Sequence, residues 1–261
     1  MKINRMTITA TLFLMLISMV SAINVKKVQA ASSDYTPNHT IDHTIFDKLL
    51  NQYVVNGVVD YKGLKKEEAT LDRYLTMLEI VKPDSLSRND RFAFYINVYN
   101  AWTIKLILTG YPDIESIKDM GSLFKSPWKK KIVRLNGDVV TLDYIEHEIL
   151  RPDFKDSRVH FAINCAAKSC PPLRSEAYQG SSLDYQLDDS TSSFINDPQM
   201  NYLKGEKLYI SKIFDWFEED FNGVHRFFLQ YARGNLKKEL IRIGDKVRIK
   251  HLDYDWDLNG S

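Results

Sequence analysis

The fold is decided by residues 92–107, Phe-Ala-Phe-Tyr-Ile-Asn-Val-Tyr-Asn-Ala-Trp-Thr-Ile-Lys-Leu-Ile. Large apolar side chains in this stretch cover most of a helix's circumference, which is the pattern of a helix buried on nearly every side. Gly110 and Pro112 then supply the signals that end a helix. The sequence therefore predicts a central buried helix over residues 88–109.

Two asparagines, Asn97 and Asn100, interrupt this apolar helix three positions apart and therefore share a face. A buried amide without hydrogen-bond partners costs about 1–3 kcal/mol, so both side chains must be bonded. Two roles stay open: the pair ties down neighbouring loops, or it lines a site, where an amide can support an oxyanion.

Turn signals and hydrophobic periodicity predict the elements on both sides of this helix. Before it, we expect a helix from Asp42, a hairpin at Asn56-Gly57 and a helix over residues 65–80. After it, we expect a hairpin at Asn136-Gly137 and a helix over 142–151, which Thr141 caps and Pro152 stops. A strand over 159–164 and a loop over 165–176 should follow. The remaining expected elements are helices around 184–196 and 212–234 and a strand over 246–252. The pattern indicates an α+β fold, with the central buried helix packed on a small, mostly antiparallel sheet.

The first thirty residues have the three parts of an export signal. Lys2 and Arg5 form a basic start, residues 7–22 are mostly apolar, and Val28-Gln29-Ala30 resembles a cleavage site. We expect a signal peptide over 1–30, a flexible leader over 31–41 and a single domain over 42–261. The protein is then exported, either periplasmic or secreted, with no stable membrane span after cleavage.

Composition narrows the classes of partner. The 261-residue chain is 44% hydrophobic and 26% charged, values that are ordinary for a globular protein and argue against disorder. The formal net charge of +1 gives no electrostatic reason to expect a nucleic acid. We expect a peptide or small-molecule ligand and no cofactor.

The segment from His160 to Cys170 is the candidate reactive site. Cys165 follows an apolar run, and a cysteine becomes a useful nucleophile when a histidine or another cation lowers its pKa. His160 is the nearest histidine in the sequence, but positions 160 and 165 of a regular strand face opposite ways. A direct pair would require the strand to end or bulge first.

A second candidate base is His147. Asp143 lies four residues before it and can share its helix face, and Glu146 is its neighbour. Either carboxylate could orient the imidazole of a thiol-hydrolase site. These charges could instead form a structural ion-pair network with Arg151, and His160 could be a core histidine.

The two cysteines, Cys165 and Cys170, leave other chemistries open. A bridge between them would contribute only about 2 kcal/mol because the loop is short, so bridged and free thiols are both consistent with the sequence. Zinc binding together with His147 and His160 lacks the usual close spacing of ligands, so no metal site is predicted. The spacing is also not the C-x-x-C of thiol redox proteins.

Six ordered segments together resemble the domain-of-unknown-function 547 family, as an exported, bacterial-type member. They are 53–61 (YVVNGVVDY), 94–104 (FYINVYNAWTI), 142–151 (LDYIEHEILR), 159–174 (VHFAINCAAKSCPPLR), 211–217 (SKIFDWF) and 254–256 (YDW). The resemblance implies that the asparagine pair, the Glu146-His147 pair and the His160–Cys170 segment belong to the family's signature. Tyr95 stands where the family usually has Trp. By fold analogy, we also expect a papain-like or transglutaminase-like arrangement.

Two functions follow as hypotheses. In the first, a thiol-dependent hydrolase or acyl transferase acts on peptide or amide bonds; Cys165 is the nucleophile, and His147, His160 and Glu146 are the other catalytic candidates. Asn97, Asn100, Lys168 and Arg174 are candidates for binding or oxyanion support. In the second, a non-catalytic exported domain binds a ligand or protein in a groove lined by Tyr95, Tyr99, Trp102 and Trp216, with a structural cysteine pair.

Overall fold

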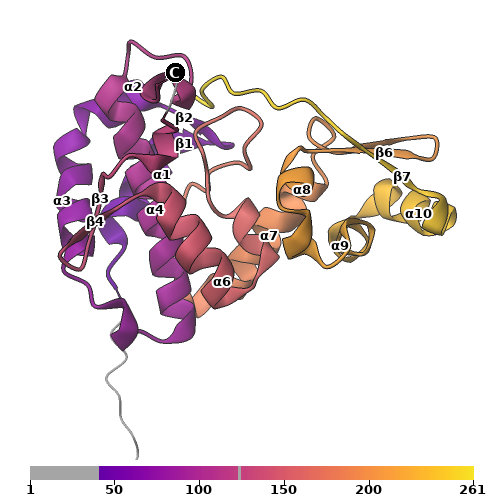
Figure 1. The fold of residues 1–261 in the computed structure, drawn as a ribbon, viewed down its shortest axis with the longest axis horizontal. Helices are drawn as coiled ribbons and strands as arrows, with labels where there is room; N and C mark the ends of the chain where they lie inside the picture. Colours follow the sequence, from indigo (N-terminus) through magenta and orange to yellow (C-terminus); the bar gives the residue numbers. More distant parts are fainter. Residues whose placement is uncertain (1–40, 123–124) are drawn as a thin grey trace, which may run out of the picture. The chain divides into compact units, whose positions relative to one another are not determined.

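The computed structural model describes residues 41–122 and 125–261, which fall within one contact unit, Asn38–Ser261 (Figure 1). The predicted signal peptide over 1–30 lies outside the described residues, as does the predicted leader apart from Ile41. In the described part of the chain, no helix combines the length and the apolar composition that crossing a membrane requires.

Helix α4, Arg88–Gly110, is the central buried helix that the sequence predicts. Its side chains from Phe92 to Ile104 are buried without interruption. The hydroxyl of Ser87 caps the first turn by accepting the backbone N–H of Asp90. The helix packs mainly against other helical segments: α3 (Glu68–Glu79), η4 (Ile145–Leu150) and η6 (Gly180–Ser182).

The other helical segments are shorter than α4 and lie before and after it in the chain. Before α4 lie α1 (Thr44–Tyr53), α2 (Tyr61–Lys66) and η1 (Pro83–Ser85); after it lie η2 (Ile117–Met120), η3 (Pro127–Lys129), α5 (Leu142–Tyr144), α6 (Arg151–Phe154), η5 (Ser157–Phe161), α7 (Leu183–Ile195), α8 (Ile213–Trp216), η7 (Glu218–Phe221), α9 (Val224–Tyr231), α10 (Gly234–Ile243) and η8 (Gly244–Lys246).

The strands form small separate sheets, which confirms the predicted α+β class. Antiparallel pairs join β1 (Val54–Val55) to β2 (Val58–Val59), and β3 (Val133–Leu135) to β4 (Asp138–Val140). In the third sheet, β6 (Lys207–Ile210) lies between antiparallel β5 (Tyr202–Lys204) and parallel β7 (Arg248–His251). Both Asn-Gly turns have positive φ at the asparagine and the glycine, the conformation that favours this dipeptide in tight hairpins.

Two apolar cores share the segment η5. The larger one surrounds α4 and includes Val159. The smaller one includes Phe161 and packs α7, α8 and α9 against the three-stranded sheet; its phenylalanines are Phe161, Phe194, Phe214, Phe221, Phe227 and Phe228. Because Val159 and Phe161 belong to different cores, η5 holds the residues that follow it at the boundary between them.

The C-terminal strap, residues 252–261, returns from β7 to the first hairpin and is the yellow trace in Figure 1. Gly260 pairs with Val59, Leu258 with Ala167, and Asp257 with Ser116. These bridges attach the strap to segments about 90 to 200 residues earlier in the chain. The strap therefore brings its aromatic side chains to the loop that contains Cys165.

The predicted strand over 159–164 is wrong, since this segment is the 3₁₀ helix η5 followed by irregular chain. A short apolar run has the same pattern in a buried strand and in a buried helical turn, and η5 is buried by both cores. The carboxylate of Asp156 caps it by accepting the backbone N–H of Arg158.

Several predicted helix boundaries also differ from the structure. Pro152 does not stop the helix that Thr141 caps: α6 follows the π turn of η4 directly and continues past Pro152 to Phe154. The predicted helix over 65–80 is divided into α2 and α3 at Glu67. The predicted helix over 212–234 is broken into α8, η7 and α9: Phe217 separates α8 from η7, and Asn222 and Gly223, both with positive φ, separate η7 from α9. The β5–β6 hairpin and α10 were not predicted.

Candidate functional site

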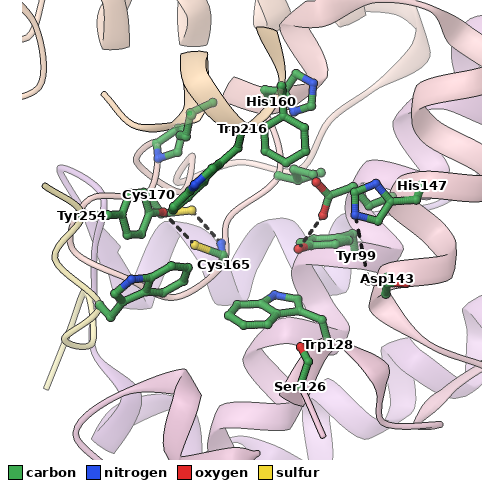
Figure 2. Close-up of a pocket in the computed structure, with 16 residues that line it drawn as sticks. Tyr99, Ser126, Trp128, Asp143, His147, His160, Cys165, Cys170, Trp216 and Tyr254 are labelled. Carbon is green, nitrogen blue, oxygen red and sulfur yellow. Dashed lines mark hydrogen bonds and ion pairs between the residues drawn. The ribbon is translucent and has the colours of Figure 1, made fainter. Parts of the chain in front are cut away.

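A pocket of about 210 Å³ opens at the boundary between the two cores (Figure 2). It contains all four of the predicted catalytic candidates: Cys165, His147, His160 and Glu146. The complete lining is Tyr99, Ser126, Trp128, Asp143, Glu146, His147, His160, Ile163, Cys165, Cys170, Pro171, Ile213, Trp216, Phe217, Tyr254 and Trp256. In Figure 2, Cys165, Cys170 and Tyr254 lie on one side and Tyr99, Asp143 and His147 on the other.

Buried amides position the backbone of Cys165. Oδ1 of Asn100 on α4 accepts the backbone N–H of Asn164 at 2.8 Å. The side chain of Asn164 in turn accepts from the backbone N–H of Ala166 (2.9 Å) and donates to the carbonyl of Pro171 (2.8 Å). The chain on both sides of Cys165 is therefore fixed to the central helix.

Ala166, directly after Cys165, has a φ of 63° and is fully buried. Alanine rarely adopts this left-handed conformation, which costs about 1–2 kcal/mol. Such strain persists only where the surrounding structure imposes it, and it is concentrated at functional sites. The strained backbone thus marks the position beside the sulfur as a candidate site, independently of the sequence pattern.

The sulfur of Cys165 is surrounded by hydrogen-bond donors. Burial alone raises the pKa of this thiol, but the Cys170 thiol, the Tyr254 hydroxyl and the backbone N–H of Ala167 together lower it below its usual value. The hydroxyl of Tyr254 lies 3.1 Å from Sγ. Burial, followed by the electrostatic influence of the two cysteines, raises the pKa of Tyr254, so the phenol keeps its proton and can donate it.

Cys170 is a free thiol, as is Cys165. Its Sγ accepts the backbone N–H of Cys165 at 2.8 Å. Burial and then the neighbouring Cys165 raise the pKa of Cys170 well above its usual value. Of the two thiols, Cys165 is therefore the one that ionises, and Cys170 stays protonated as a donor. The structure thus has free thiols, one of the two alternatives that the sequence left open.

Glu146 and His147 project into the pocket from η4, Ile145–Leu150, which is a π-helix. Single turns of π-helix inside α-helices are rare and occur frequently at functional sites. Glu146 is buried, and its carboxylate accepts the hydroxyl of Tyr99 at 3.2 Å. Nε2 of His147 lies 3.9 Å from Oδ1 of Asp143.

One charged network connects the two histidines. A guanidinium NH of Arg151 lies 3.0 Å from Nδ1 of His147. Because a guanidinium can only donate, Nδ1 accepts and the ring proton of His147 is on Nε2. Nε of Arg151 also donates to Asp220 at 2.6 Å. Nε2 of the buried His160 donates to the same carboxylate at 2.6 Å.

This network lowers the pKa of the Asp220 carboxyl group. The hydrogen bond from His160, then that from Arg151, holds the pKa of the Asp220 carboxyl well below its usual range despite partial burial.

His160 also stacks on Phe217, with ring centroids 4.1 Å apart. Nδ1 of His160 has no hydrogen-bond partner among residues 41–122 and 125–261. No hydrogen bond joins Sγ of Cys165 to either imidazole within these residues.

Aromatic rings form the wall of the pocket next to Cys165. Trp216 and Trp256 have centroids 5.6 Å apart, and Tyr254 lies 4.8 Å from Trp216 and 4.4 Å from Trp256. Trp128 completes the group at 5.8 Å from Trp256. We call these four side chains the aromatic wall. It belongs to η3, α8 and the C-terminal strap, so distant parts of the chain build it.

The four residues predicted for binding or oxyanion support do not line this pocket. Asn97 bonds the backbone of Tyr178, and Asn100 bonds Ala162 and Asn164, so both tie down loops. Lys168 pairs with Asp257 at the surface. Arg174 is bound by acidic groups of its own neighbourhood, Glu176 and Asp189.

Of the aromatics predicted to line a groove, Tyr99 and Trp216 line the pocket, whereas Tyr95 and Trp102 are buried side chains of α4. The sequence does not indicate Asp220 or Trp128 as site residues. Phe217, Tyr254 and Trp256 appear in it only as members of motifs, since nothing local indicates that the last ten residues return to Cys165. In the described part of the chain, no group of three or more His, Cys, Asp or Glu side chains could hold a metal ion.

The comparisons with known proteins bear on the central part of the chain. Residues 83–195 match a family model whose description is "Protein of unknown function, DUF547". No curated protein and no solved structure matches the chain. The matched segment includes α4, η4, η5 and the Cys165–Cys170 loop, so this part of the chain is similar to the DUF547 family.

Proposed function

We propose that the protein is a thiol-dependent hydrolase or acyl transferase that acts on peptide or amide bonds, with Cys165 as the nucleophile. The observation that carries the proposal is the state of this side chain. It is a free thiol that lines a pocket, and its sulfur is surrounded by donors that favour the thiolate. A thiolate is the reactive form of cysteine.

In the reaction, Sγ of Cys165 attacks the carbonyl carbon of the substrate, and the carbonyl oxygen becomes an oxyanion. The C–N bond then breaks, the amine leaves with a proton, and a thioester remains on Cys165. Water, or a second amine, attacks the thioester and restores the thiol. The thioester is the intermediate that distinguishes this proposal from simple binding.

His160 is better arranged than His147 to exchange protons in these steps. Asp220 accepts from Nε2 of His160 and orients the ring, which leaves Nδ1 to accept or donate. Nδ1 of His147 is already occupied by Arg151. Because His160 makes no direct bond to the sulfur, we propose transfer through one water molecule, a geometry open to a general base. His147 then offers its Nε2–H as a donor to the oxyanion.

The test is acylation by p-nitrophenyl acetate. Attack by Cys165 releases p-nitrophenolate and leaves one acetyl group on the protein, which mass spectrometry locates. We expect a burst of p-nitrophenolate and acetyl on Cys165 in the wild type, and neither in Cys165→Ala. His160→Gln should accumulate the acetyl form because hydrolysis slows. Acetylation that persists unchanged in Cys165→Ala would contradict the proposal.

The aromatic wall favours a second candidate, a non-catalytic pocket that binds a ligand through stacked rings. The same experiment separates the two. A binding protein retains its ligand in Cys165→Ala and forms no thioester in the wild type.

The proposal includes export of the mature protein. It is supported by the basic start, the apolar run and the Val28-Gln29-Ala30 pattern of the sequence. Sequencing the N-terminus of the protein recovered outside the cytoplasm tests this part. A retained Met1 would contradict it.

A further inference from the structure

Glu146 is a buried carboxylate that the proposed chemistry does not use. Its residue is only 9% exposed, it lines the pocket, and its hydrogen-bond partner is the neutral hydroxyl of Tyr99. Among residues 41–122 and 125–261, no cationic side chain pairs with it. Burying a carboxylate without a cation is costly, so a cationic ligand group would find an unpaired counter-ion among the described residues here.

Arg151 does not supply a positive charge to Glu146. Arg151 follows Glu146 by five positions, but its guanidinium is bound to Asp220 and Glu219. It also donates to His147. Asp143, another carboxylate, lines the same pocket with its side chain partly exposed. The polar side of the pocket is therefore acidic.

The opposite side of the pocket suits a cation as well. Aromatic faces attract ammonium and guanidinium groups within about 6 Å of the ring centroid. The aromatic wall already holds one such group, since Nζ of Lys118 lies 3.9 Å from the centroid of Trp256. Trp216, which is 44% exposed, and Trp128 remain to contact a ligand.

Glu146 and Cys165 are close enough to influence each other. The negative charge of Glu146 opposes ionisation of Cys165, and both charges raise the pKa of Tyr99, after the larger effect of burial. Because both residues line one pocket, a cation bound at Glu146 would share that pocket with the reacting sulfur. It would also remove the repulsion between Glu146 and the thiolate.

We propose that the pocket recognises a cationic side chain, an ammonium or guanidinium group, next to the acyl bond that Cys165 attacks, with Glu146 as its counter-ion. This inference rests on the proposed function and adds its substrate class: peptides or amides with a basic residue at the reacting position. Glu146 is thus a specificity-determining residue rather than an acid–base group.

Three methanethiosulfonate reagents of similar size test this recognition: 2-aminoethyl (cationic), 2-hydroxyethyl (neutral) and 2-carboxyethyl (anionic). The Cys165 thiolate attacks the sulfenyl sulfur, a disulfide forms, and methanesulfinate leaves. The rate constant for modification of Cys165, located by mass spectrometry, is measured for each reagent. The ratio of cationic to neutral rates reports recognition, whereas the neutral rate alone reports thiol reactivity.

The matched variants are Glu146→Gln and Glu148→Gln. Glu148 is an exposed residue of the same π turn, so its replacement removes the same charge from the same element. Because Glu146→Gln removes the charge that pairs with the cation, we expect it to lower the cationic-to-neutral ratio about tenfold or more. Glu148→Gln should leave the ratio unchanged. Glutamine still accepts from Tyr99, so the fold should be retained.

Equal ratios in the two variants would overturn the inference, while a fast neutral rate at Cys165 would leave the proposed function standing. A wild-type preference for the anionic reagent would also overturn the inference, and this result needs no variant. Slow reaction with all three reagents would contradict the proposed function together with the inference. If Glu146→Gln does not fold, Glu146→Asp takes its place, and it should keep the preference for the cation.

Discussion

The hydroxyl of Tyr254 lies 3.1 Å from Sγ of Cys165, although 89 positions separate the two residues. The contact exists because the C-terminal strap pairs with the loop that follows Cys165. The backbone N–H of Lys168 donates to Asp257 at 2.8 Å, and that of Ser169 donates to Asp255 at 3.1 Å. The strap thus supplies a donor to the sulfur and two rings of the aromatic wall, so the candidate site is complete only when the C-terminus is in place.

Replacing Tyr254 by phenylalanine tests this donor. The Tyr254 hydroxyl is one of the groups that lower the pKa of Cys165, so Tyr254→Phe should raise that pKa. Less thiolate is then present at neutral pH, and alkylation of Cys165 by iodoacetamide at pH 7 should slow by about tenfold. The rate–pH profile should move to higher pH. Tyr185→Phe, which removes an exposed hydroxyl, should leave the profile unchanged.

The asparagine pair of α4 offers a matched test of how the Cys165 loop is held. Each side chain makes two buried hydrogen bonds to backbone, those of Asn97 to Tyr178 and those of Asn100 to Ala162 and Asn164. Asn97→Ala and Asn100→Ala should each lower the free energy of unfolding by about 2–5 kcal/mol. Only Asn100→Ala should also slow alkylation of Cys165. Equal alkylation rates in both variants would show that Asn100 does not position the loop.

Asp220 should stabilise the fold in a pH-dependent way. Its pKa is depressed by His160 and Arg151, so its contribution is fully present above the unfolded pKa of about 3.9 and is lost as the pH falls towards the lower folded pKa. Asp220→Asn should cost about 2–3 kcal/mol at pH 7. The difference from wild type, measured by urea unfolding, should shrink below about pH 4.

The control for this prediction is Glu219→Gln. Glu219 also pairs with Arg151, but its side chain is 78% exposed. An exposed ion pair contributes about 0–1 kcal/mol, so this variant should unfold nearly like the wild type. A loss as large as that of Asp220→Asn would indicate that the network depends on its total charge rather than on the buried contact.

The two Asn-Gly hairpins allow a test of the packing behind Cys170. Gly57 and Gly137 have nearly the same φ, 81° and 85°. A Cβ on Gly57 would lie 2.5 Å from Cβ of Pro172, whereas one on Gly137 would meet nothing within 4 Å. Gly57→Ala should therefore cost about 1–3 kcal/mol more than Gly137→Ala. Equal unfolding free energies would mean that the first turn does not pack tightly on the loop after Cys170.

Local sequence patterns are enough to predict much of the fold. The continuous apolar stretch of α4 predicts a buried helix, and each Asn-Gly turn predicts a hairpin because that dipeptide tolerates two positive φ values. The segment over 159–164 could not be predicted, because burial by two separate cores gives a 3₁₀ turn the composition of a strand. The β5–β6 hairpin has charged residues around Gly205, and its strands of three and four residues are too short for alternation to predict them.

The sequence predicts only some of the residues of the candidate site. The sequence predicts Cys165, His147, His160 and Glu146 as candidates, and the structure brings these four side chains to one pocket; their chemical roles stay predictions. It could not indicate that Asp220 orients His160, that Arg151 occupies Nδ1 of His147, or that Tyr254 contacts the sulfur. Each of these contacts depends on tertiary packing, because no local periodicity connects their positions.

The most direct test of the account is the reactivity of the two thiols in the protein, isolated without reductant. Iodoacetamide labelling at pH 7, followed by mass spectrometry, gives a rate for each cysteine. Because Cys165 has a lowered pKa and Cys170 a raised one, we predict that Cys165 reacts at least about tenfold faster. A quantitative Cys165–Cys170 disulfide, or equal and slow labelling of both thiols, would contradict an activated nucleophile at position 165.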